Sequence, residues 1–174
     1  MTVRFQPEKI RQAIAYIASK LPEQRNMYKV LKVMYFADKE HLRRYGRLIF
    51  GDSYLALQHG PVPRNAYRRV SNIRDGWISP DSKPEPLFKV EKNDTIVPLV
   101  NPELEYFSDS DLECINAEIE ICRPLSFGEL KIRSHDAAFL SAGENDEMSI
   151  ESIASAAAQN PEERELLLSH LADA

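Results

Sequence analysis

The residues best suited to chemistry are a carboxylate and an imidazole that lie one helical turn apart, Asp38 and His41. Asp38 interrupts an apolar stripe, four positions after Met34 and four before Leu42. A carboxylate on such a face is costly unless a cation pairs with it or backbone groups donate hydrogen bonds to it. Asp38 therefore either anchors a neighbouring segment or belongs to a recognition site or a catalytic pair with His41. The sequence leaves both interpretations open.

Three histidines could be metal ligands if the fold brought them together with Asp38 and Asp136. They are His41, His59 and His135. A single histidine in a turn or a helix cap is more common, and the chain contains no Gly-rich phosphate loop, His-Glu-x-x-His motif or nucleophile elbow. We therefore expect no enzymatic activity, no metal and no cofactor. We assign Asp38, His135 and Asp136 as structural, buried polar residues.

An arginine-rich stretch begins at Arg64 and predicts a helix with a basic outer face. Helices followed by a basic helix and then a β-hairpin form the order of a winged helix-turn-helix, so a DNA-binding regulator is one hypothesis. The net charge of −5 opposes it, because a phosphate backbone requires a basic surface. A nucleic-acid partner is not expected.

The same stretch can instead form a protein-binding surface. Gly60, Pro61 and Pro63 predict a tight turn, and Pro63 suits the first position of a helix that ends at Gly76. Arginine and tyrosine dominate interface energetics, and a preset turn loses little entropy on binding. Alternatively, the turn packs against Asp38 while the partner binds the hairpin or the C-terminal helices. The predicted binding residues are His59, Pro61, Val62, Pro63, Arg64, Tyr67 and Arg68.

A long helix between the capping residue Asn26 and Gly46 must position these residues. Its apolar side chains cover much of the circumference, which is typical of a buried helix. We predict that the buried residues are Leu31, Met34, Tyr35 and Leu42, together with a paired Asp38. The fold class is therefore mainly α, a compact helical domain around this long central helix.

The remaining elements are mostly helical. Pro7 begins a helix that Pro22 stops, Ser108 caps another, and Ser126 with Glu129 forms a capping box. Residues 87–90 and 95–97 predict a short β-hairpin, after a polar loop over 79–86. We expect a single domain over 1–174, with a core of about 5–140 and a helical extension over 144–174.

Composition describes an ordinary globular protein. The chain has 174 residues, 43% of them hydrophobic, and no apolar run of about 20 residues that could span a membrane. We expect a cytoplasmic protein with no membrane partner. Cys114 and Cys122 lie eight positions apart on one predicted helix, too far apart for a disulfide, and should be reduced core residues.

Three segments together resemble the Panacea domain of SocA-like antitoxins, over residues 5 to 140. They read VLKVMYFADKEHLRRYG, GDSYLALQHGPVPRNAY and SFGELKIRSHDAAF. The most specific part is Met34-Tyr35-Phe36-Ala37-Asp38, preceded by Leu31 and followed about twenty residues later by Gly60-Pro61-Val62. The family often has an aromatic residue at the position of His59 and a tryptophan near Phe139, so the chain departs from it there. The segment after Gly143 lies largely outside the resemblance.

The resemblance implies a mostly helical fold with a small β element and an antitoxin of a two-gene pair, usually on phage-derived or mobile DNA. Such proteins neutralise a cognate toxin by direct contact, and one branch delivers the toxin to a protease. The binding residues predicted above then become the candidate toxin-binding surface. A small neighbouring gene that cannot be cloned without this one would favour the antitoxin over the DNA-binding regulator.

Overall fold

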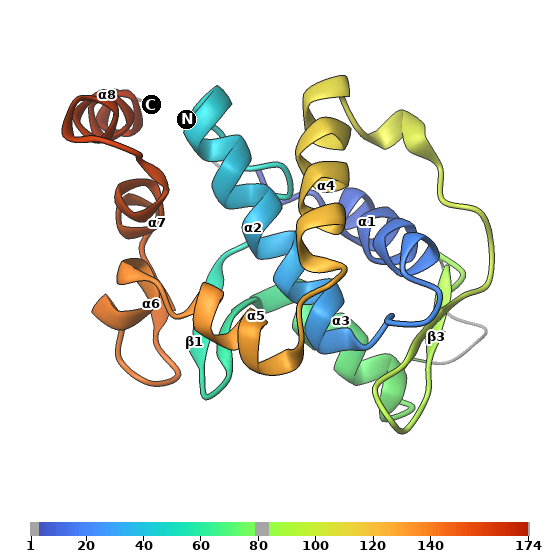
Figure 1. The fold of residues 1–174 in the computed structure, drawn as a ribbon. Helices are drawn as coiled ribbons and strands as arrows, with labels where there is room; N and C mark the ends of the chain where they lie inside the picture. The colour runs from blue at the N-terminus through green and yellow to red at the C-terminus, as the bar shows by residue number, and fades with distance from the viewer. Residues whose placement is uncertain (1–3, 79–83, 174) are drawn as a thin grey trace.

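The computed structural model describes residues 4–78 and 84–173, so residues 79–83 of the predicted loop lie outside the described residues. Helices dominate the described chain and two small antiparallel sheets accompany them, which confirms the predicted fold class. Figure 1 shows α2 (Met27–Tyr45) with α1 (Pro7–Lys20) and α4 (Asp109–Cys122) on one side and α7 (Ile150–Ala157) on the other.

Local capping explains where α2 begins and ends. The Asn26 side chain accepts a hydrogen bond from the Tyr28 N–H, and Gly46 takes a left-handed conformation with φ +70°. The predicted burial is confirmed, because the accessible surface is 1% or less at Leu31, Met34, Tyr35, Asp38 and Leu42. Helix α2 is thus packed on several sides by other elements.

A three-stranded sheet lies beside α2, and one part of its prediction is wrong. Residues Gly60–Pro63 form strand β2, paired with β1 (Tyr54–Leu57), whereas the predicted tight turn falls one step earlier, at Gln58-His59. Strand β5 (Glu147–Met148) completes the order β2-β1-β5. Strand β2 can contain two prolines because it lies at the sheet edge, where fewer backbone N–H groups have to donate hydrogen bonds to a neighbouring strand. The prediction of a single hairpin therefore missed this sheet.

Helix α3 (Arg64–Arg74) follows β2 directly, with Pro63 as its N-cap instead of its first residue. The predicted hairpin is confirmed as β3 (Phe88–Val90) and β4 (Ile96–Pro98). This hairpin packs on the helical body, with β3 against α3 and β4 against α1. A short 3-10 turn, η1 (Leu104–Tyr106), leads into α4.

Four more helices complete the described chain: α5 (Phe127–Ser134), α6 (Ala137–Ser141), α7 and α8 (Pro161–Ala172). The predicted capping box at the start of α5 is present, with both Ser126 and Glu129 bonds formed. Cys114 and Cys122 are free and buried, as predicted. None of the described helices is long and apolar enough to cross a bilayer.

Candidate functional site

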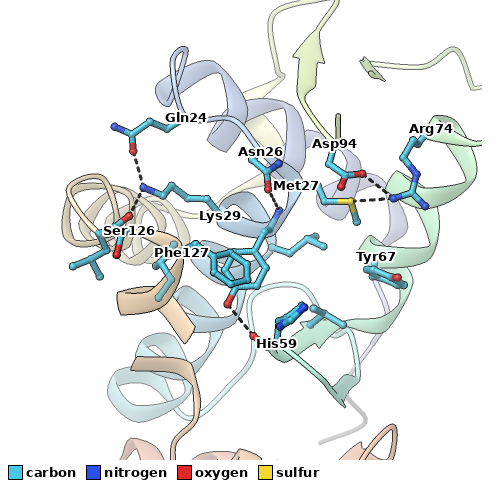
Figure 2. Close-up of a pocket in the computed structure, with 15 residues that line it drawn as sticks. Gln24, Asn26, Met27, Lys29, His59, Tyr67, Arg74, Asp94, Ser126 and Phe127 are labelled. Carbon is cyan, nitrogen blue, oxygen red and sulfur yellow. Dashed lines mark hydrogen bonds and ion pairs between the residues drawn. The ribbon is translucent and has the colours of Figure 1, made fainter. Parts of the chain in front are cut away.

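A groove with a volume of about 660 Å³ opens at the start of α2. Its walls come from α2, the β1–β2 turn, α3, the tip of the β3–β4 hairpin and the start of α5. Figure 2 shows these side chains around a common hollow. The apolar part of the lining consists of Met27, Tyr28, Leu31, Val62, Tyr67, Leu125, Phe127 and Leu130. We call this the α2 groove.

Three rings form one wall of the α2 groove. The Tyr28 and Phe127 ring centroids are 4.3 Å apart, and His59 lies edge-on to Phe127 at 5.4 Å. The Tyr28 hydroxyl donates a 2.9 Å hydrogen bond to the His59 carbonyl (Figure 2). Burial raises the pKa of Tyr28 to about 12, so this hydroxyl remains protonated, and a donor, well into the alkaline range. Phe127 nevertheless keeps 51% of its surface exposed.

Paired polar groups close the two ends of the α2 groove. At one end the Lys29 ammonium donates to the Gln24 side chain at 2.6 Å and to the Leu125 carbonyl at 2.7 Å. At the other, Arg74 pairs with Asp94 at 2.8 Å (Figure 2). Because these charges already have partners, the apolar centre is the part that a ligand would contact.

A buried lysine of α2 holds the β1–β2 segment that forms part of the groove wall. The Lys32 ammonium donates a 2.6 Å hydrogen bond to the Pro61 carbonyl and lies 5.1 Å from the Tyr28 ring centroid. Burial lowers the pKa of Lys32 to about 7, partly offset by the charge of Asp136. Gly60 permits this contact, since its φ is +107° and a Cβ there would lie 2.7 Å from the Lys32 nitrogen. The β1–β2 turn is therefore held directly on α2.

Asp38 is an anchor for the segment that follows α2. Its Oδ1 accepts hydrogen bonds from the Ile49 N–H at 2.5 Å and the Phe50 N–H at 3.3 Å, and its Oδ2 accepts the Tyr54 hydroxyl at 2.6 Å. Burial raises the pKa of Asp38 to about 7, against the lowering effect of these three hydrogen bonds. The first of the two interpretations of Asp38 is thus the one that the geometry supports.

His41 belongs to a different polar cluster. Its ring nitrogens lie 2.9 Å from the Arg47 carbonyl and 3.0 Å from the Ser110 hydroxyl. Asp111, buried nearby, accepts from Lys9 at 2.8 Å and from Arg47 at 2.9 Å. This cluster joins the starts of α1 and α4 to the end of α2, so His41 has a structural environment separate from Asp38.

His135 and Asp136 are only partly buried, which corrects the prediction of burial for both. Asp136 caps α6 and accepts from the Tyr35 hydroxyl at 2.7 Å and from Lys39 at 2.8 Å. The His135 ring stacks on Phe139 at 4.1 Å. Within residues 4–78 and 84–173, no three His, Cys, Asp or Glu side chains come together as metal ligands would.

The predicted binding residues divide between different places. His59, Val62 and Tyr67 line the α2 groove. Pro61 and Pro63 are buried within β2, Arg64 pairs with Glu147 of β5 at 3.2 Å, and Arg68 lines a separate cavity. The seven predicted residues therefore do not form one continuous surface, and the structure brings together only the three that line the groove.

The sequence interpretation missed several residues of the site, above all Tyr28 and Phe127. The starts of their helices could be predicted from Asn26 and from the Ser126 capping box. The sequence did not indicate that the starts of α2 and α5 lie against each other. It also missed Asp52, which caps α3 across the sheet by accepting from the Asn65 N–H and the Ala66 N–H, each at 3.0 Å. No local sequence pattern indicates a cap supplied by a residue 13 and 14 positions before the N–H groups that it accepts from.

Comparison with protein families identifies the family of this chain's central region. The family model described as "Antitoxin SocA-like, Panacea domain" matches residues 30–139, from the first turns of α2 to α6. Most of the α2 groove lies inside this range, whereas α7 and α8 lie outside it. No curated protein and no solved structure matches the chain.

Proposed function

The chain belongs to the SocA-like antitoxin family with a Panacea domain, since that family's model matches well over half of its 174 residues, and we propose that it neutralises a cognate toxin by binding it directly. The proposed contact surface is the α2 groove. The observation that carries this assignment is an apolar hollow, open to solvent and walled by three aromatic rings, two of which, His59 and Phe127, belong to the family's matched region.

The groove suits an apolar anchor from a protein partner. An exposed phenylalanine on the rim, backed by a tyrosine, offers a large contact area whose desolvation favours association. The walls are held in advance by the bonds of Tyr28 to His59 and of Lys32 to Pro61, so little order has to be gained on binding. We propose that a toxin inserts one or two apolar side chains between Tyr28, Phe127 and Tyr67.

We propose that neutralisation is stoichiometric and involves no enzymatic step. In support, the three histidines considered above occupy separate environments, at the α4 junction, on the groove wall and against Phe139. The proposal predicts that His41→Ala and His135→Ala variants that fold still protect cells from the toxin, since neither residue lines the α2 groove.

The DNA-binding alternative finds less support at α3. Arg64 pairs with Glu147, and Arg74 pairs with Asp75 at 2.9 Å and with Asp94. The hairpin that would form the wing packs back on α1 and α3. With a net charge of −5, these contacts leave few cations on this helix for a phosphate backbone.

Delivery of the toxin to a protease and a location on phage-derived DNA are finer parts of the same proposal. They would extend the family's role and are tested by toxin half-life with and without this protein, and by the genes that flank it. Neither is needed for direct neutralisation.

The experiment that tests the function uses the neighbouring gene. We expect a small adjacent reading frame that is toxic when expressed alone and harmless when this chain is co-expressed. If the adjacent product is harmless alone, or if this chain protects only by shutting off its transcription from the native promoter, the direct-binding proposal fails. Expression of the toxin from an unrelated promoter separates those two results.

A further inference from the structure

A second cavity, of about 260 Å³, lies between the start of α1 and the outer side of α3, away from the α2 groove. Two neighbouring arginines line it, Arg68 and Arg69, together with the amide side chain of Asn72 and the apolar side chains of Phe5 and Ile10. No carboxylate is among its lining residues in the described chain. The cavity therefore presents cationic and amide donors beside an apolar floor.

Neither Arg68 nor Arg69 has a hydrogen-bond or ion-pair partner among the described residues, whereas Arg64 and Arg74 of the same helix are both paired. Arg69 is also half-buried. A guanidinium that is partly removed from water without an acceptor is unfavourable, and proteins usually pair such groups. The arrangement leaves a donor set that an added anion would satisfy.

Charged groups of α1 lie close to this cavity. Burial, and then the charge of Arg11, lower the pKa of Arg69, while the charge of Glu8 raises it. The Glu8 carboxylate, which follows the cavity residue Pro7 in the chain, is already paired with Arg11 and accepts a 3.0 Å hydrogen bond from the Gln12 side chain. Pro7, the first residue of α1, lines the cavity, and the Gln6 side chain gives that helix no capping bond. The positive end of the helix dipole thus adds to the arginine charges.

We propose that this cavity binds a single oxyanion, a phosphate or a carboxylate group, through Arg68, Arg69 and Asn72. The guanidinium fork matches both groups and can donate two parallel hydrogen bonds to either. Phe5 and Ile10 can accommodate the short carbon chain to which the anionic group is attached. The natural source is either a small phosphorylated molecule or an acidic side chain of a protein partner. This site is additional to the antitoxin function and does not depend on it.

Calorimetric titration of the full-length chain with inorganic phosphate and, separately, with acetate tests the proposal at constant ionic strength. We expect saturable binding of at least one anion, weakened at least about tenfold in Arg69→Gln, which corresponds to about 1.4 kcal/mol. Arg64→Gln is the matched control, because Arg64 is on the same helix but pairs with Glu147 outside the cavity. Arg68→Gln, at an exposed position, provides a second variant if Arg69→Gln does not fold.

The two anions distinguish the sources. Binding of phosphate alone assigns the site to a phosphorylated molecule, and binding of acetate alone assigns it to a carboxylate side chain. The proposal is overturned if neither anion binds, or if Arg69→Gln and Arg68→Gln bind as tightly as Arg64→Gln.

Discussion

The Tyr28 hydroxyl donates a 2.9 Å hydrogen bond to the His59 backbone carbonyl and thereby joins the first turn of α2 to the β1–β2 turn. The Tyr28 ring meanwhile contacts Phe127 at the start of α5. One side chain thus connects three elements that are far apart in sequence. This connection forms part of the wall of the α2 groove. Substitutions of Tyr28 can therefore distinguish what its hydrogen bond and its ring each contribute to toxin binding.

Tyr28→Phe keeps the ring and removes the bond. Because one such hydrogen bond contributes about 0.5–1.5 kcal/mol net, toxin binding should weaken by less than about tenfold. Tyr28→Ala also removes the apolar wall, and should weaken binding by at least about 30-fold, as expected for a hot spot. Isothermal titration with the toxin measures both. Equal losses in the two variants would show that the hydroxyl, and not the ring, makes the contact.

Asp38 should make the folded protein less stable as the pH rises from about 4 to about 7. Burial raises its pKa from 3.8 to about 7, so in this window the folded chain holds a proton that the unfolded chain has lost. The free energy of unfolding therefore falls as the pH rises, and this loss is complete above pH 7. Asp38→Asn cannot titrate, and its amide can still accept from Ile49 and Phe50.

Urea denaturation at pH 4.5, 5.5 and 6.5 measures this difference. Relative to the parent, Asp38→Asn should gain at least about 1 kcal/mol of unfolding free energy between the lowest and highest pH. Parallel curves for the two proteins would contradict a raised pKa for Asp38.

Lys32 should affect stability at higher pH than Asp38 and in the opposite direction. Burial lowers its pKa from 10.5 to about 7, so between these values the unfolded chain binds a proton that the folded chain lacks. Stability should therefore rise with pH from about 7 to about 10 in the parent. Lys32→Met, which has a similar volume and no charge, should lack this rise. Denaturation at pH 7, 8.5 and 9.5 compares them, and a rise of equal size in the variant would assign it to other groups.

Helix limits could be predicted well from the sequence because helix caps are local. Asn26, Gly46, Ser108 and Ser126 each act within a few residues of the end that they define, and each was recognised. The three-stranded sheet escaped prediction because β5 has only two residues and β2 carries two prolines. Such strands are defined by pairing with β1 and not by their own composition.

The candidate site was predicted only in part for the same reason. The burial of Asp38 could be expected from the apolar face of its helix, but its three donors come from residues 11 to 16 positions later. His59, Val62 and Tyr67 lie close together in the sequence, and the structure places all three at the α2 groove. Their partners Tyr28 and Phe127 join them only through tertiary packing, which no single segment encodes.

Binding of the purified toxin to Phe127→Glu and Ile132→Glu tests the central claim most directly. Both residues are exposed on α5, at 51% and 79%, but only Phe127 lines the α2 groove. Glutamate at the first position of a helix is compatible with the helix dipole, so Phe127→Glu should keep its melting temperature.

We predict that Phe127→Glu weakens toxin binding at least about 30-fold and abolishes protection, since it places a charge in an apolar contact. Ile132→Glu should bind and protect like the parent. Undiminished binding by Phe127→Glu, with lost binding by Ile132→Glu, would place the toxin on the opposite face of α5 and contradict the assignment of the α2 groove.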